Sequence, residues 1–146
     1  MHHLYLILHI IAACIWIGGH LLLLIRYLPE AFKKKSTEII SAFEEKFEFI
    51  GIPALLIQVI TGVLMAYHYD VGVTKWFQFE NQIERVISLK LILLFLTLIL
   101  AIHARLFIIP KLNINNLKQL GWHILLVNII GIIMLILGTF IRFGGI

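Results

Sequence analysis

The stretch LYLILHIIAACIWIGGHLLLLIRYL, residues 4–28, decides the fold class. It has no acidic residue and no Lys or Arg before Arg26, and it is longer than the about 20 residues that a helix needs to cross a bilayer. Backbone N–H and C=O groups inside lipid must bond within their own segment, so we expect a membrane-spanning helix here. The run is too long for a signal peptide and lacks a small-residue cleavage site.

Three more apolar runs follow the first, which we bound at residues 4–27. They cover about residues 49–69, 86–109 and 121–141. Of the 146 residues, 61% are hydrophobic and only 14% are charged, whereas soluble domains carry about 25% charged residues. A soluble globular enzyme is therefore excluded. The sequence predicts one all-α domain over residues 1–146, a four-helix transmembrane bundle, and it shows no internal repeat.

The distribution of Lys and Arg predicts the topology. Eight of these residues flank the first and third loops, and four lie on the other side. The positive-inside rule then places both loops in the cytoplasm and both termini outside, in a multi-pass protein of a bacterial-type inner membrane. Because topology explains the net charge of +4, we expect no nucleic-acid partner.

The first loop has its own helical pattern. Residues 36–47 place Ile39, Ile40, Phe43 and Phe47 at helical spacing against an acidic face, and Ser36 or Thr37 is a suitable N-cap. This pattern predicts an amphipathic helix at the membrane interface that leads directly into the second span.

Histidines carry the chemistry. Five of the seven lie within or at the ends of the spans: His9, His20, His68, His103 and His123. Polar side chains are costly in lipid and are usually functional there. His9, Trp16 and His20 share one face of the first helix, and the two imidazoles are about 16 Å apart along its axis. That separation is too large for one metal ion and predicts two sites at two depths.

Depth along the spans suggests how the histidines pair. We expect His9 to lie at the same depth as His68, and His20 at the same depth as His103. His123 is a further member of this inner group. Facing imidazoles from different helices are how such bundles hold haem. We therefore expect His9, His68, His20 and His103 as metal ligands, with Trp16 beside them. Small residues would let a flat macrocycle approach the backbone, namely Ala12, Ala13, Gly18 and Gly19.

Two cations lie inside the third span. Lys90 and Arg105 would neutralise haem propionates or an anionic substrate, or else extend to the two membrane surfaces. The simpler interpretation of the histidines is that they bridge helices by hydrogen bonds. His2, His3 and His123 lie where interfacial water would satisfy them.

Several stretches resemble a known family. Residues 8–20 (LHIIAACIWIGGH), followed by Tyr27-Leu28-Pro29, resemble the first helix of the small CopD-like membrane proteins, which are named for copper resistance and are similar to HemJ-type protoporphyrinogen oxidases. Residues 49–62 (FIGIPALLIQVITG) resemble their second helix. Residues 88–91 (SLKL) and 103–105 (HAR) resemble their third.

The resemblance implies four helices and a b-type haem. It also implies that His9 and Lys90 match the residues expected to matter for haem and activity in the HemJ relatives. The chain departs from the HemJ pattern at Gly19-His20-Leu21 and at Leu28-Pro29-Glu30. The extra histidine, His20, favours a second haem.

Three functions follow as hypotheses. The first is a haem b-binding membrane cytochrome with two haems that transfers electrons between leaflets, with a quinone or a redox protein as partner. The second is a HemJ-like oxidase of protoporphyrinogen with one haem near His9 and Lys90. The third is copper transport or copper resistance, in which His2, His3 and His9 receive the metal and Met65 or Met134 passes it on.

Copper is the least favoured cofactor. The methionines do not form a spaced thioether series and Cys14 stands alone, whereas a Cu(I) path needs several soft ligands. A purely structural subunit is the remaining alternative. On the last span, Gly131 and Gly138 would seat a partner helix, which suggests a homo-oligomer in the lipid.

Overall fold

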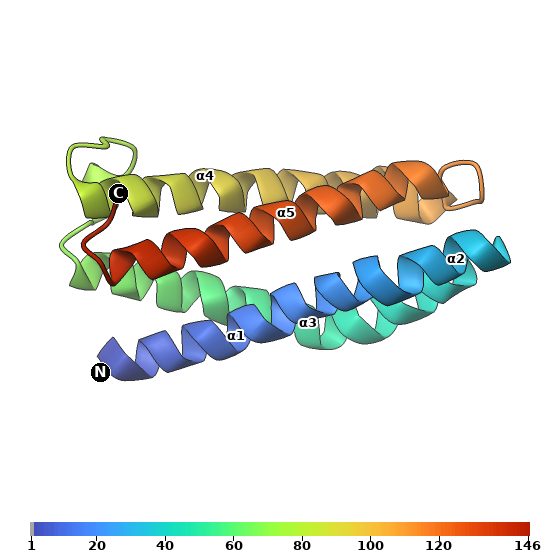
Figure 1. Ribbon diagram of the computed structural model, residues 1–146, viewed down its shortest axis with the longest axis horizontal. Helices are drawn as coiled ribbons and strands as arrows, with labels where there is room; N and C mark the ends of the chain where they lie inside the picture. Colours follow the sequence, from blue (N-terminus) through green and yellow to red (C-terminus); the bar gives the residue numbers. More distant parts are fainter. Residues whose placement is uncertain (1) are drawn as a thin grey trace.

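The chain folds into four long helices that run alternately up and down (Figure 1). The computed structural model describes residues 2–146, and describes side chains from His3 onward. Each of the four helices is long and apolar enough to cross a membrane, which confirms the predicted all-α, four-helix membrane fold. Both chain termini lie at one end, called the terminal end below; the opposite end is called the loop end.

The first transmembrane helix is longer than the sequence indicates. It consists of α1 (His2–Leu22), a π-helical segment η1 (Leu23–Tyr27) and α2 (Leu28–Lys34). Pro29, expected after the span, lies in the first turn of α2. Proline lacks the N–H that continues an α-helix, and the wider register before it, in which Leu28 N–H donates to Leu23 O, lets the helix continue.

The third transmembrane helix has the same construction. It contains α4 (Gln82–His103), a π-helical segment η3 (Ala104–Ile108) and a 3-10 turn η4 (Ile109–Lys111) that includes Pro110. Its start is capped by Asn81, whose side chain accepts a hydrogen bond from Glu84 N at 2.8 Å.

The second helix, α3 (Glu38–His68), is one continuous element of 31 residues. It includes most of the amphipathic stretch 36–47, so the prediction that this stretch leads directly into the span is confirmed. The apolar face of this stretch, however, does not face the membrane interface. Ile40 is fully buried in the protein core and Phe43 packs against the same cluster, so this apolar face contacts the bundle. The last helix is α5 (Leu117–Ile141), and a short turn, η2 (Val73–Lys75), lies between α3 and α4.

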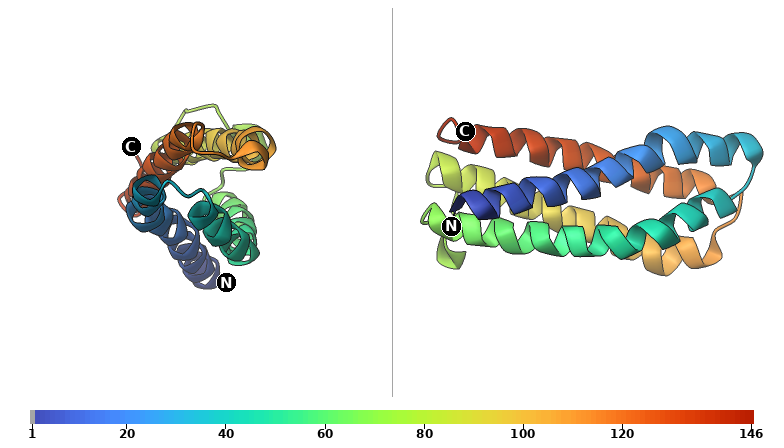
Figure 2. Two further views of the ribbon diagram at one scale, coloured as in Figure 1. Left: turned by 90° about the vertical axis from the view of Figure 1, so that its right-hand side faces the viewer. Right: turned by 90° about the horizontal axis from the view of Figure 1, so that it is seen from below.

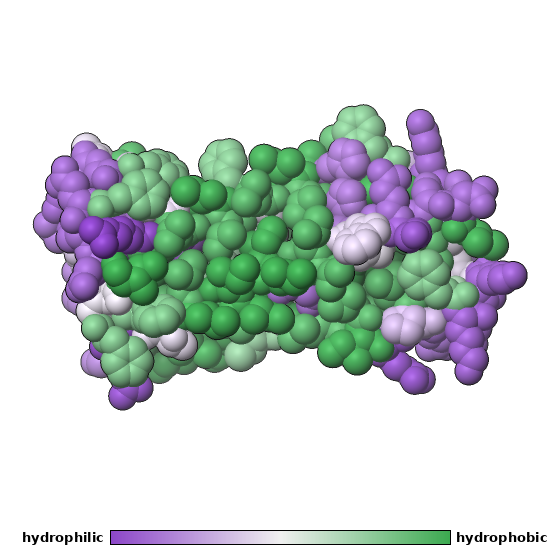
Figure 3. Space-filling view, turned by 45° about the horizontal axis from the view of Figure 1, so that its top comes forward, coloured by the Kyte–Doolittle hydropathy of each residue, from purple (hydrophilic) through white to green (hydrophobic). Residues whose placement is uncertain are grey.

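Three apolar clusters fill the bundle along its length. The loop-end cluster includes Leu23, Ile40 and Ile108. A middle cluster is formed by Ala12, Ala13, Trp16, Ile17, Ala54 and Val127, and a terminal-end cluster by Ala66, Val71 and Ile87. On the face drawn in Figure 3, the surface is largely apolar between two polar ends, which is the pattern that a bilayer favours.

The four helices do not pack around the axis evenly. α1 packs along α3, α4 packs along α5, and α1 joins the two pairs through α5. α3 and α4 do not pack closely, and their ribbons lie apart in the end view of Figure 2. The accessible surface is 9139 Å², whereas a compact monomer of 16.8 kDa exposes about 7,700 Å². The bundle thus leaves more helix surface uncovered than a closed bundle would.

Candidate functional site

Polar side chains gather between the middle and terminal-end clusters. His9 comes from α1, Gln58 and Thr61 from α3, and Lys90 from α4. These four residues are called the polar layer below. None of them belongs to the three apolar clusters. Polar groups at this depth are costly, so the layer is the first place to look for function.

His9 is held in one tautomer. Its Nδ1 atom lies 3.0 Å from Thr61 Oγ1, and this hydroxyl donates its own hydrogen to Ile57 O at 2.6 Å. Thr61 Oγ1 must therefore accept from His9 Nδ1–H, which leaves a lone pair on Nε2. A fixed Nδ1–H partner that frees Nε2 is the usual support of a metal-binding histidine.

Lys90 is a cation without an anion. Its Nζ atom lies next to Gly138 on α5, where an added Cβ would be 3.5 Å away. Among residues 2–146, no carboxylate forms an ion pair with Lys90. A half-buried ammonium in an apolar bundle needs a compensating negative charge, which points to an anionic group on a ligand.

The layer also has an unmatched acceptor and a close contact between the His9 ring and α3. Gln58 Oε1 is buried and has no donor among the described residues. At Gly62 an added Cβ would lie 3.2 Å from His9 Cε1, so glycine lets the imidazole pack directly against the backbone of α3. The donor groups of these residues fit a haem: His9 offers a nitrogen lone pair, and Lys90 offers a charge for a propionate.

The sequence interpretation missed Gln58 and Thr61. Both are polar residues inside the apolar run 49–69, which is the signal that would have found them. His68, the expected partner of His9, is the last residue of α3 and is exposed. It lies seven residues, about 10 Å, beyond Thr61 and packs its ring against Tyr69 at 5.7 Å.

His20 lies deeper, in an aromatic setting. Its Nδ1–H donates to Trp16 O at 2.8 Å, so its Nε2 also keeps a lone pair. The Trp16 ring is 4.4 Å away and the Phe47 ring 5.6 Å away, between centroids. An added Cβ at Gly19 would overlap the Phe47 ring, so the space expected for a macrocycle is taken by this phenylalanine.

The other small residues that were expected beside a macrocycle lie in different surroundings. Gly18 faces open space, while Ala12 and Ala13 are part of the middle cluster. Asn128 donates to His20 O at 3.0 Å and to Ile124 O at 2.8 Å. Its Oδ1 atom is buried without a donor among the described residues. An acceptor and an imidazole lone pair therefore occur together around His20.

The structure joins His103 to His123. His123 Nδ1–H donates to Gln119 O at 3.0 Å, so its Nε2 accepts from His103 Nδ1–H at 2.9 Å. The rings stack with an interplanar angle of 11°. A metal ion held between two nitrogens from opposite sides would separate them by about 4 Å. His103 and His123 are therefore joined by a direct hydrogen bond and not through a metal ion. His20, the expected partner of His103, bonds to Trp16 O instead.

Arg105 already has a counter-ion. Its Nη1 atom lies 2.9 Å from Glu48 Oε2, and this ion pair links η3 to α3 at the loop end. Of the two cations in the third span, Lys90 is therefore the one available to a ligand. The His2 side chain lies outside the described part of the chain.

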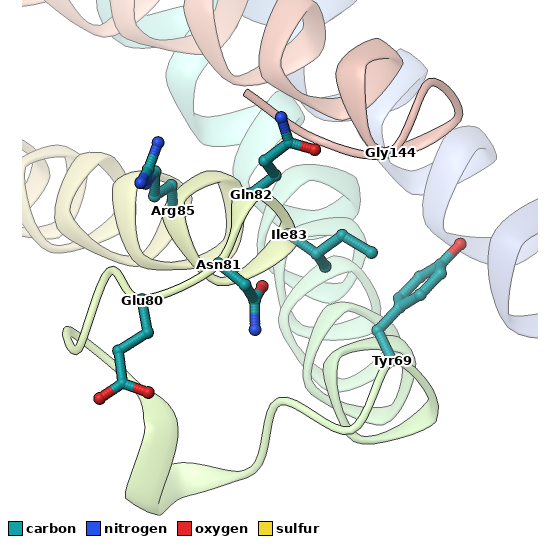
Figure 4. A pocket seen from close by; sticks show the side chains of 7 residues that line it. All are labelled: Tyr69, Glu80, Asn81, Gln82, Ile83, Arg85 and Gly144. Carbon is teal, nitrogen blue, oxygen red and sulfur yellow. The ribbon is translucent and has the colours of Figure 1, made fainter.

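Surface cavities lie away from the polar layer. One of about 420 Å³ lies at the terminal end, where the side chains come from the end of α3, the start of α4 and the C-terminal segment (Figure 4). It is lined by Tyr69, Glu80, Asn81, Gln82, Ile83, Arg85 and Gly144. An apolar groove of about 300 Å³ lies between α1 and α3.

Comparisons with known proteins identify no relative. No protein-family model, no curated protein and no solved structure matches the chain. Within the described residues, no group of three or more His, Cys, Asp or Glu side chains is placed to hold a metal ion. The polar layer is therefore the feature of the molecule that indicates a function.

Proposed function

We propose that the protein is a haem b-binding integral membrane oxidoreductase with one haem at the polar layer. The observation that carries this proposal is the pairing, in one layer, of an imidazole with a free Nε2 and an ammonium without a counter-ion. Such a pair suits a ligand that offers both a metal centre and a carboxylate. The resemblance to HemJ-type oxidases at His9 and Lys90 points to the same two residues.

Each residue of the layer has a distinct role in this proposal. His9 would bind the haem iron through Nε2, and Thr61 would hold the imidazole in the required tautomer. Lys90 would bind a propionate or the carboxylate of a substrate. Bound haem would supply one-electron redox chemistry. The apolar clusters on either side would exclude water from the layer.

Protoporphyrinogen is the substrate that the resemblance suggests. With both termini outside, the polar layer lies in the outer half of the bilayer, and the electrons would pass to a quinone or a redox protein. A strain that lacks its protoporphyrinogen oxidase tests this activity. We expect the gene to restore haem synthesis and Lys90→Met to abolish the rescue, with His68→Ala as the matched control that retains it. Failure of the wild-type gene, expressed and membrane-inserted, would contradict the oxidase activity.

A second candidate is transfer of electrons across the membrane by two haems. It is favoured by His20, which keeps an Nε2 lone pair about 16 Å from His9 and lies next to the unmatched Asn128 Oδ1. A second haem there would require Phe47 to move from Gly19. A count of two haems per polypeptide, reduced to one by His20→Ala, would establish this candidate. Metal analysis that finds copper and no iron would instead favour copper handling.

A further inference from the structure

The first and third transmembrane helices repeat one another. Equivalent features lie 81 residues apart: His9 and Lys90, Trp16 and Thr97, the π-helical starts Leu23 and Ala104, and Pro29 and Pro110. The second member of each hairpin repeats at a spacing of 80, where Ile40 matches Leu120 and Gly51 matches Gly131, all four of them buried. The chain thus contains two similar helical hairpins, α1 with α3 and α4 with α5.

This repeat makes two interfaces between the hairpins equivalent. One is α1 against α5, and the other is α4 against α3. The first is closed: Asn128 on α5 donates to His20 O, and Gly131 on α5 lies against Ile17. The second lacks comparable packing. The two-fold relation between the hairpins is therefore broken at the α3–α4 interface.

The open stretch coincides with the polar layer. Toward the loop end, Leu55 on α3 and Leu100 on α4 pack against the middle cluster. Toward the terminal end, Ala66 and Ile87 share the terminal-end cluster. Between these levels, over about 16 Å of α3, no apolar cluster joins the two helices. The third transmembrane helix is also the least covered, with 11% of its apolar window buried against 28% for each of the others.

We propose that the ligand of the polar layer enters sideways from the bilayer, between α3 and α4. This inference rests on the proposed function and adds the route and the physical class of the ligand, which is a membrane-dissolved molecule. Lys90 would attract its anionic group. Entry of a bulky ligand requires α3 and the third transmembrane helix to move further apart, and the Arg105–Glu48 ion pair joins η3 to α3 at the loop end.

The test holds the two helices at their present separation. In a Cys14→Ser background, Glu48→Cys and Arg105→Cys are joined by a bis-maleimide, and the full chain is purified from haem-starved cells into lipid nanodiscs. Phosphatidylcholine vesicles that carry haemin deliver the probe, and the rise of the haem absorption band gives the uptake rate. The same variant capped with a monofunctional maleimide is the first control. Ile17→Cys with Gly131→Cys, joined by a direct disulfide across the closed α1–α5 interface, is the second.

We expect the α3–α4 crosslink to slow haemin uptake about tenfold relative to the capped protein, while the α1–α5 crosslink leaves the rate unchanged. Equal rates for crosslinked and capped α3–α4 protein would overturn the lateral route and leave the haem site intact. Equal slowing by both crosslinks would also overturn it. If the capped protein binds no haemin at all, the proposed function fails and the route fails with it.

Discussion

His9 Nδ1 and Thr61 Oγ1 lie 3.0 Å apart, and their hydrogen bond joins α1 to α3 in the layer that also contains Lys90. The bond determines which imidazole nitrogen is free, because Thr61 uses its own hydrogen on Ile57 O. One buried hydroxyl therefore links helix packing to the chemistry of the site.

Thr61→Val tests this link. Valine has the shape of threonine but cannot accept from His9 Nδ1–H, which leaves a buried donor unpaired at a cost of about 1–3 kcal/mol. Loss of such a partner typically lowers metal affinity about 10–100-fold. Haemin titration should show this loss in Thr61→Val, whereas Thr61→Ser keeps the acceptor and should retain most of the affinity. Equal affinities for the two variants would show that the hydroxyl does not position His9.

The Lys90→Met substitution should preserve or raise the stability of the haem-free protein but weaken haem binding. Without an anion, the ammonium is an unpaired charge in the bundle, so a methionine of similar length should leave thermal stability unchanged or raise it. With haem bound, the same variant should lose affinity, because a propionate loses its cation. Lys90→Arg keeps the charge and serves as the control. Tm measured in detergent with and without haemin reports both effects, and destabilisation of the haem-free Lys90→Met protein would contradict the unpaired cation.

Neighbouring glycines of the first helix should respond differently to alanine. A Cβ at Gly19 would overlap the Phe47 ring, so Gly19→Ala should destabilise the protein by about 1–3 kcal/mol. Gly18 has nothing within 4 Å of an added Cβ, and Gly18→Ala should be neutral or stabilise by about 0.5–1 kcal/mol through helix propensity. Unfolding of the two variants in parallel checks this prediction. Similar effects at both positions would mean that Phe47 does not occupy the space above Gly19.

The loop between α3 and α4 should show a small pH effect. Lys75 Nζ lies 2.6 Å from Asp70 Oδ2, and this hydrogen bond and charge lower the pKa of the Asp70 carboxyl and raise the pKa of Lys75. The Asp70 contribution to stability is present above its ordinary pKa of 3.8 and is lost as the pH falls through the lowered value. An NMR titration of Asp70 in wild type and Lys75→Met should show a higher pKa in the variant. The same pKa in both would exclude the ion pair in solution.

Hydropathy predicted the fold because four apolar runs in a chain of low charge have few other structures available in lipid. It did not predict where the helices end. Pro29 appeared to be a terminus, yet a π-helical register carries the first helix through it to Lys34. Composition does not encode this change of register, which depends on the local backbone bonds.

The site was predicted only in part, for a related reason. His9 and Lys90 stand out as polar residues in apolar runs, but residue counting placed His9 level with His68. The helices are longer than the apolar runs, because the first continues to Lys34 and the second begins at Glu38. Counting from the edges of the apolar runs therefore misplaces His9 by two turns, and Thr61 is the residue that it contacts. The hairpin repeat was also missed, because equivalent positions such as His9 and Lys90 hold different residues. The His103–His123 contact was within the predicted inner group.

The proposed function depends on a single haem that is bound through His9. The most direct measurement is the haem content per polypeptide of the purified protein, taken from the pyridine haemochrome spectrum and compared between wild type, His9→Ala and His68→Ala. We expect one b-type haem in wild type and in His68→Ala, and none in His9→Ala. A colourless wild-type protein, or His9→Ala with undiminished haem, would contradict it.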